Sequence, residues 1–209
     1  MSDIKDKSIQ LFLEELASKS PTPGGGSVSA LMGAQAAALV SMVCNLTIGK
    51  EKYAEVENVM ITLLAEAEAL REKLMTLIAA DVDTFNNLMS AYALPKESDA
   101  EKTRRSEVIQ QALKLATQVP LECARACAEV VKLSRIAAQN GNLVVISDAG
   151  AAVMSAYGGL KSASLNVYIN TNNLKDCDFV KSTLLDLEGI LKDVDVLAEE
   201  IFQIVRAKL

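Results

Sequence analysis

A repeat of apolar residues spaced alternately by four and three runs through the middle of the chain, and it constrains the fold more than any other feature. Such a repeat places its members along one face of a single helix, here roughly 40 residues or about 60 Å long if unbroken. The positions are Val56, Met60, Leu63, Ala67, Leu70, Leu74, Leu77, Asp81, Thr84 and Leu88. The chain is therefore predicted to contain a long helix whose apolar face packs against other helices.

Composition extends this prediction to the whole chain. Of its 209 residues, 50 % are hydrophobic but only 4 % are aromatic, which favours an aliphatic core and closely packed helices. Prolines and glycines are few, and the sequence contains no run of alternating β-branched residues that would predict a strand. No change in composition marks a domain boundary. We expect an all-α fold, an up-and-down bundle of long antiparallel helices that forms a single domain over residues 1–209.

Start and stop signals divide the rest of the chain into further helices. Ser98 and Glu101 form a capping box that predicts a helix over residues 99–140, with a kink at Pro120. Residues 142–146 are expected to be extended, and Ser147 and Asp148 to cap a helix that ends near residue 168. The remaining predicted helices are residues 5–18, residues 27–49 with Ser27 as N-cap and Gly49 as C-cap, and one amphipathic helix from about residue 179 onward.

The glycine-rich turn at residues 20–27 is the candidate floor of a binding site. Gly24, Gly25 and Gly26 precede a helix without charged residues, in which Ser29, Gly33, Ala37, Ser41 and Asn45 form a stripe of small side chains that permits close packing. The glycines leave the first N–H groups of the helix and its positive dipole end open to an anion. No Lys-Ser or Lys-Thr follows the last glycine, so the turn is not a nucleotide P-loop. A merely flexible turn is the alternative.

Asp81 interrupts the apolar repeat where a leucine would be expected. A carboxylate among apolar side chains is costly unless it is paired or hydrogen-bonded, so its pKa is expected to rise. A carboxyl group of raised pKa can transfer protons near neutral pH, which makes Asp81 the candidate catalytic residue. The sequence leaves open the alternative that the helices splay here and water solvates Asp81. Asp83 is expected to be an exposed acid.

Charge and cysteine usage limit the function classes. The net charge is −6 and the basic residues are scattered, which argues against a nucleic-acid surface. No signal peptide is recognisable, and the cysteines lie in apolar helical patterns typical of reduced thiols, so a cytoplasmic protein is expected. The uncharged residues 24–49 are long enough to cross a bilayer, but Gln35 and Asn45 within them favour a helix buried in protein.

The chain contains no histidine, which removes the commonest general base and the commonest zinc ligand. Cys123 and Cys127 lie one turn apart, but the other cysteines are remote, so no metal site is expected. Lys96, Arg104 and Arg105 flank a loop, and such residues are solvated by default. If they line a pocket, they suit a carboxylated ligand.

A set of short motifs resembles the formiminotetrahydrofolate cyclodeaminase family, which also contains bacterial methenyltetrahydrofolate cyclohydrolases. The resemblance covers nearly the whole chain, and the motifs occur in one order. They are Ser20-Pro-Thr-Pro-Gly-Gly-Gly-Ser-Val, Asn45-Leu-Thr-Ile-Gly-Lys50, Asp81-x-Asp83-x-Phe85, Leu94-Pro-Lys96, Val119-Pro-Leu121, Gly141-Asn142, Ser147-Asp148 and Asn166-Val-Tyr-Ile-Asn170.

The resemblance implies an all-helical homodimer that binds a tetrahydrofolate near the subunit interface and needs no metal or redox cofactor. It implies that 5-formiminotetrahydrofolate is converted to 5,10-methenyltetrahydrofolate with release of ammonia, with Asp81 as proton acceptor. The alternatives are a methenyltetrahydrofolate cyclohydrolase and a non-catalytic folate-binding dimer. By resemblance alone, substrate binding is expected at Gly24, Gly25, Gly26, Ser27, Asn142, Ser147 and Asp148, with Lys96 or Arg104 at the glutamate tail.

Overall fold

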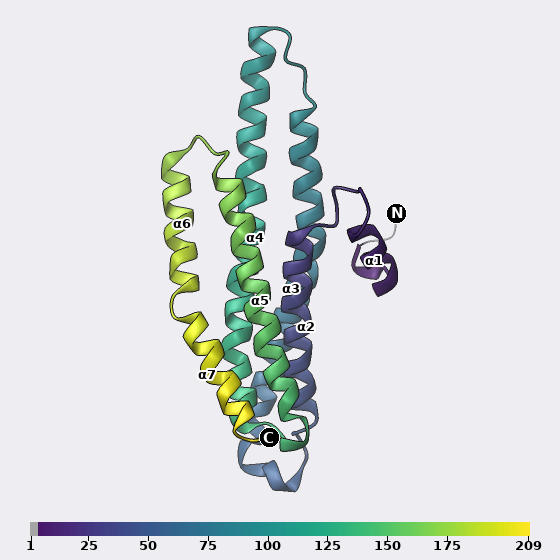
Figure 1. The fold of residues 1–209 in the computed structure, drawn as a ribbon, viewed down its shortest axis with the longest axis vertical. Coiled ribbons are helices and arrows are strands. Elements are labelled where there is room, and N and C mark those ends of the chain that lie inside the picture. The colour runs from purple at the N-terminus through teal and green to yellow at the C-terminus, as the bar shows by residue number, and fades with distance from the viewer. Residues whose placement is uncertain (1–3) are drawn as a thin grey trace.

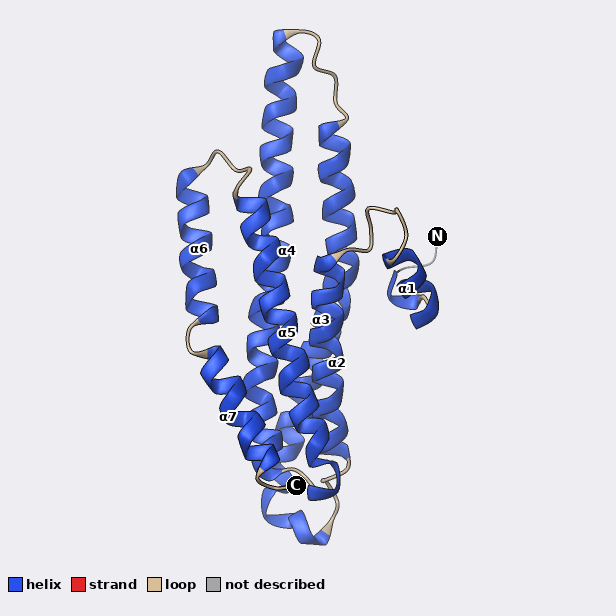
Figure 2. Cartoon of the chain, viewed as in Figure 1, coloured by secondary structure: helices blue, strands red, loops and turns tan. Residues whose placement is uncertain are grey.

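The structure is a computed structural model that describes residues 4–209, and within that range it contains helices and connecting loops but no strand (Figure 2). The all-α prediction is confirmed. The α-helices are α1 (Ile9–Leu16), α2 (Gly25–Asn45), α3 (Glu57–Tyr92), α4 (Asp99–Asn140), α5 (Ile146–Thr171), α6 (Cys177–Leu191) and α7 (Val194–Arg206). Short 3-10 helices are η1 (Ile4–Asp6), η2 (Glu51–Val56) and η3 (Leu143–Val145).

Helices α2, α3, α4 and α5 form the body of the bundle, and α6 and α7 cover α4 and α5 along one side (Figure 1). At one end α3 and α4 continue beyond the beginning of α2 and project as a pair (Figure 1). Their apolar residues there form a separate small core around Leu88, Ile109 and Leu113. The beginning of α2 therefore lies part-way along α3, beside a stretch where α3 has fewer helical neighbours.

The stripe of small residues on α2 is buried against α5 and α4. Ser29, Gly33, Ala37 and Ser41 are all buried, and only Asn45 at the end of the helix is exposed. A methyl group on Gly159 of α5 would lie 2.9 Å from the carbonyl oxygen of Ser29 and 3.3 Å from the backbone nitrogen of Gly33. The backbones of α2 and α5 thus touch without intervening side chains, as the stripe predicted.

Pro120 does not end α4, which runs unbroken from Asp99 to Asn140. Because proline has no N–H, the carbonyl of Ala116 loses its helical donor. The side-chain amide of Asn170, on α5, donates to that carbonyl at 2.7 Å. Asn170 therefore satisfies a backbone group that the proline leaves without a partner.

Three predicted helix boundaries were wrong. Gly24 is the N-cap of α2, and Ser27 lies inside its first turn because its hydroxyl has another partner. Residues 143–145 form η3 rather than an extended segment, and α5 begins at Ile146, so Ser147 and Asp148 do not cap it. The single C-terminal helix is two, broken at Asp193, which adopts a left-handed backbone conformation with φ 59°.

The other boundaries agree more closely with the prediction. The Ser98–Glu101 capping box is present, with the Glu101 carboxylate accepting from Ser98 N at 2.8 Å. Gly49 was predicted as the C-cap of α2, but α2 ends earlier, with Leu46 as its C-cap. Gly49 has φ +75° and lies in the turn before η2. The predicted first helix is shorter than expected, because Ser8 caps α1 at residue 9.

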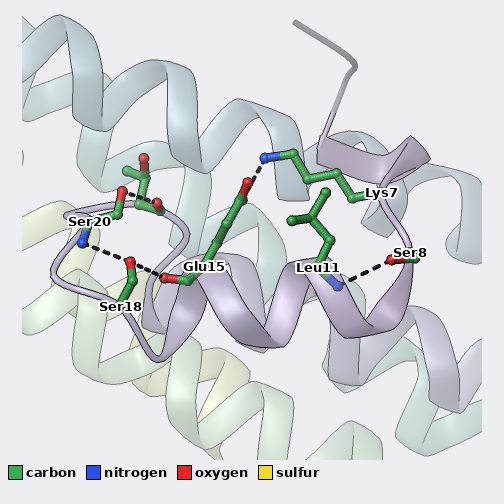
Figure 3. A network of polar contacts seen from close by, with 7 residues as sticks. Lys7, Ser8, Leu11, Glu15, Ser18 and Ser20 are labelled. Atoms are coloured by element: carbon green, nitrogen blue, oxygen red, sulfur yellow. Dashed lines mark hydrogen bonds and ion pairs between the residues drawn. The ribbon is translucent and has the colours of Figure 1, made fainter.

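Helix α1 lies to the side of the bundle and leads into the glycine-rich turn (Figure 1). Figure 3 shows how polar contacts shape this segment: Lys7 pairs with Glu15 at 2.5 Å, and the Ser8 hydroxyl accepts from Leu11 N. After the helix, Ser18 Oγ donates to the Glu15 carbonyl, and Ser20 N donates to Ser18 Oγ at 2.9 Å. These local bonds turn the chain back toward the start of α2.

Two stretches are long and apolar enough to cross a membrane, Gly25–Asn45 and Leu143–Thr171. In the bundle, 61 % of the apolar window of the first and 50 % of that of the second are buried against the rest of the protein. Both contribute to the contact between α2 and α5, which we call the buried seam. Packing within the fold therefore accounts for their apolar composition.

Candidate active site

The carboxyl group of Asp81 lies against the first turn of α2. Ser27 Oγ donates a hydrogen bond to Asp81 Oδ2 at 2.8 Å, and the backbone of Ser27 donates a second bond to the same side chain. A methyl group on Gly26 would lie 2.0 Å from Asp81 Oδ1 and 2.5 Å from Cγ. Only glycine at position 26 therefore leaves room for the carboxyl group in this position.

Burial raises the pKa of Asp81, and the two hydrogen bonds from Ser27 oppose the rise without cancelling it. The site agrees with the expectation that an acid in the apolar repeat has a raised pKa. Ser27 was expected to cap the helix, but its hydroxyl donates to this carboxyl group instead. Asp83, two residues further on, is exposed, as predicted.

Buried thiols lie behind the carboxyl group. Cys123 and Cys127 on α4 are buried, and the pKa of Cys123 is raised well above its usual value by a hydrogen bond with Cys127, by burial and by the charge of Asp81. Burial also raises the pKa of Cys44 to about 12. The raised pKa values keep Cys44 and Cys123 protonated, and all three thiols belong to the core. Over residues 4–209, no group of three histidine, cysteine or acidic side chains is close enough to hold a metal ion.

The glycine turn is open toward α5 on its other side. The N-cap residue Gly24 has no side chain, and the N–H groups of Gly25 and Gly26 have no side-chain acceptor in the described part of the chain. A methyl group on Gly25 would lie 3.8 Å from Nδ2 and 3.9 Å from Oδ1 of Asn166, on α5. The turn thus has an acid from α3 on one side and an amide from α5 on the other.

A cavity of about 410 Å³ lies further along α3, lined by four cationic side chains and no acidic one. The cations are Lys96, Lys102, Arg105 and Lys175, and Tyr92 and Asn173 form part of the wall. Asp81, Phe85, Leu88 and Tyr92 are spaced by four, three and four, so they share one face of α3. The cavity wall at Tyr92 is therefore about 16 Å from Asp81 along that face.

The predicted binding residues do not all meet in one place. The glycines, Ser27 and Asp81 come together, and Lys96 joins the cationic cavity, whereas Arg104 is exposed and does not line it. Asn142 bonds to Leu46 and Thr47 just beyond the other end of α2, about 30 Å from Gly25. Ser147 and Asp148 follow it in the first turn of α5. Within one copy of the chain these three lie too far away to join the Asp81 site.

Sequence reasoning missed Asn166, Lys102 and Lys175 as members of these sites. Asn166 was visible only as part of a motif, and nothing in its spacing pairs it with Gly25. Lys175 follows α5, and Lys102 belongs to α4, so their convergence depends on tertiary packing.

Comparison with known proteins agrees with the architecture and the motifs. A family model described as formiminotransferase-cyclodeaminase matches residues 8–188. The chain belongs to this family. The formiminotransferase-cyclodeaminase family thus accounts for the whole glycine turn, the Asp81 repeat and the α5 motif in one match.

Two kinds of family member are similar to the chain. A methenyltetrahydrofolate cyclohydrolase of Methylorubrum extorquens is 53 % identical over 204 residues, which is 98 % of both chains. The formimidoyltransferase-cyclodeaminase of Rattus norvegicus is 32 % identical over 193 residues, and this match spans only 36 % of the rat protein. A crystal structure of formiminotetrahydrofolate cyclodeaminase from Thermotoga maritima has a TM-score of 0.82 at 32 % identity and covers 99 % of this chain and 97 % of its own.

The raised pKa of Asp81 predicts a pH-dependent cost of folding. Between the ordinary pKa of an aspartate, about 3.9, and the higher folded-state value, the folded protein holds a proton that the unfolded chain releases, so stability falls as pH rises. Asp81→Asn removes this cost. We expect its free energy of unfolding, relative to wild type, to increase with pH across that window, as measured by urea denaturation.

Asp83→Asn is the matched control, because it removes an exposed carboxylate from the same turn of α3. If the free energies of unfolding of the two variants differ from that of wild type by the same amount at every pH, burial does not destabilise the charged form of Asp81.

Proposed function

We propose that the chain is a methenyltetrahydrofolate cyclohydrolase, which adds water to the carbon that bridges N5 and N10 of tetrahydrofolate and yields 10-formyltetrahydrofolate. The observation that carries this proposal is the 53 % identity to a cyclohydrolase over 98 % of both chains. The sequence motifs alone favour a cyclodeaminase, with a cyclohydrolase as the alternative. The comparisons favour the alternative, because the cyclodeaminase relatives are less similar and most of them much longer.

In the proposed mechanism, Asp81 is the general base. It accepts a proton from water as the water oxygen bonds to the bridge carbon, which carries the positive charge of the substrate. Asp81 then returns that proton to N5 as the bond between the carbon and N5 breaks. The raised pKa suits a group that must both take and give a proton near neutral pH. The reacting carbon would lie against a wall formed by Gly24, Gly25, Gly26 and Ser27.

Cyclodeamination remains the second candidate, because the chain superposes over nearly its full length on a formiminotetrahydrofolate cyclodeaminase. The same carboxyl group can serve both reactions. For cyclodeamination, Asp81 would accept the proton of N10 as N10 attacks the formimino carbon and would give it to the departing nitrogen. The third candidate, a protein that only binds folate, needs no reactive carboxyl group.

We assign the cationic cavity to the glutamate tail of the folate. It lies on the same face of α3 as Asp81. Of its four cations only Lys102 has an acidic partner among residues 4–209, Asp99 at 2.9 Å. Lys96 is part of this cavity and Arg104 is not. Of the two residues expected at the glutamate tail, the proposal therefore keeps Lys96 and drops Arg104.

We also propose that the protein acts in the cytoplasm as a homodimer. Large apolar side chains are exposed on the two buried-seam helices, among them Met42 on α2 and Met154, Leu165 and Ile169 on α5. Covering them with a second copy would remove apolar surface from water. The molar mass in solution tests this: a monomer at micromolar concentration would contradict it.

The function is tested by offering the purified protein both substrates side by side. A cyclohydrolase is expected to accelerate the loss of methenyltetrahydrofolate absorbance above the uncatalysed rate. A cyclodeaminase is expected to release ammonia from 5-formiminotetrahydrofolate. Asp81→Asn should lower kcat by roughly 10²–10⁴-fold while the fold and folate binding persist. Retained turnover in this variant would exclude Asp81 as the base, and no turnover by the wild type would favour a folate-binding protein.

Gly26→Ala tests whether the position of the carboxyl group matters. The added methyl group would meet Asp81 Oδ1 at 2.0 Å, so the carboxyl group must move, and kcat is expected to fall on the order of 10²-fold. Gly189→Ala is the control, since a methyl group there meets nothing within 4 Å and should leave kcat unchanged. Equal kcat in the two variants would show that the contact between α2 and Asp81 is not needed for turnover.

Lys96→Glu tests the tail assignment. Reversing one charge in the cavity should raise KM for the folate roughly fivefold or more, equivalent to about 1 kcal/mol, with kcat within about twofold of wild type. Arg104→Glu, an equal change of charge outside the cavity, should alter KM less than about twofold. An equal rise in both variants would indicate a general charge effect rather than a tail site.

A further inference from the structure

We propose that Asn166 positions the attacking water for the reaction, by accepting one of its hydrogens while Asp81 accepts the other. This inference rests on the proposed hydrolysis of the methenyl bridge and adds a second residue to it. Asn166 belongs to the α5 motif that the mechanism has so far left unused.

The first turn of α2 brings Asn166 and Asp81 to neighbouring residues, Gly25 and Gly26. Gly25 and Gly26 are consecutive, and neither has a side chain. The Asp81 carboxyl group lies against the second, within 2.0 Å of the missing methyl position, and the Asn166 amide lies against the first, at 3.8–3.9 Å from its missing methyl position. The bare backbone between them is flanked by a group from α3 and a group from α5.

The amide of Asn166 has a defined orientation. Its Nδ2 donates to the carbonyl of Ser162, one turn earlier on α5, at 3.0 Å. This bond requires the nitrogen to face the helix, which leaves Oδ1 as the free end. No donor from residues 4–209 bonds to Oδ1. A half-buried acceptor without a protein donor is suited to an O–H or N–H group of a bound molecule.

The chemistry of hydrolysis calls for two acceptors. As water attacks, one of its hydrogens must pass to the base, and an acceptor for the other aims the oxygen lone pair at the bridge carbon. Asp81 takes the first proton and returns it to N5 as the bond between the carbon and N5 breaks. Asn166 Oδ1 holds the remaining O–H until the carbonyl forms, when that proton passes to the freed Asp81 and then to solvent. The net reaction consumes one water and releases one proton.

Asn170, one turn further along α5, supplies a matched control. It is the same residue type on the same helix, but its Nδ2 donates to the carbonyl of Ala116 that Pro120 leaves without a donor. Removing this side chain should lower stability, because a buried carbonyl loses its partner, without changing the chemistry of the turn.

The experiment compares Asn166→Ala, Asn166→Asp and Asn170→Ala with wild type for methenyltetrahydrofolate hydrolysis, across pH, together with thermal melting. Asn166→Ala is expected to lower kcat about 30–100-fold, with KM within about threefold and the rising limb of the pH–rate profile retained, since Asp81 is still present. Asn170→Ala is expected to lower the melting temperature and to keep kcat within about threefold. Asn166→Asp keeps an acceptor oxygen and should exceed Asn166→Ala in kcat at least tenfold.

Three results would overturn the proposal: an Asn166→Ala enzyme with kcat within threefold of wild type, a rise in KM alone, or an Asn166→Asp enzyme no faster than Asn166→Ala. If Asn166→Ala does not fold, the comparison of Asn166→Asp with wild type decides, and a kcat more than about 30-fold below wild type would count against the acceptor role. A wild type that does not turn over the substrate refutes the proposed function itself. A wild type that turns it over while these variants match it refutes only the role of Asn166.

Discussion

The candidate active site depends on a single contact, that of the Asp81 carboxyl group with the start of α2. Burial makes the charged carboxylate costly, while the hydroxyl and the backbone of Ser27 supply hydrogen bonds that partly compensate. The absence of a side chain at Gly26 allows the approach. A long apolar repeat tolerates an acid at this one position because α2 brings a polar helix terminus to it, part-way along α3.

Much of the fold followed from local patterns. The four-three repeat, the capping box at Ser98 and the small stripe on α2 were all recognisable, because each arises from contacts between residues close in sequence or from one helix face. Asp81 was recognisable for the opposite reason, as a residue that violates the pattern around it. Ser27 was misread because a serine before an apolar helix is normally a cap, and only its distant partner on α3 shows otherwise.

The parts that the sequence did not indicate are those built from distant segments. Asn166 and Asn170 look alike in the sequence, yet one faces the glycine turn and the other bonds to the carbonyl opened by Pro120. The cationic cavity takes residues from the ends of three different elements. Asn142 was assigned to the substrate by resemblance, and the structure gives its side chain bonds at the far end of α2 instead.

The direct backbone contact between α2 and α5 has a consequence for the way the site is held together. Gly159 lies against Ser29 and Gly33 with no room for a methyl group, so the two helices can neither slide past nor tilt toward each other without collision. The groups proposed to act on the folate belong to three separate helices, and this seam fixes the spacing of two of them, the glycine turn on α2 and Asn166 on α5. Preorganisation in this protein would then originate in its backbone, two turns below the reacting atoms, and closure of a loop over the substrate would not be required to create it.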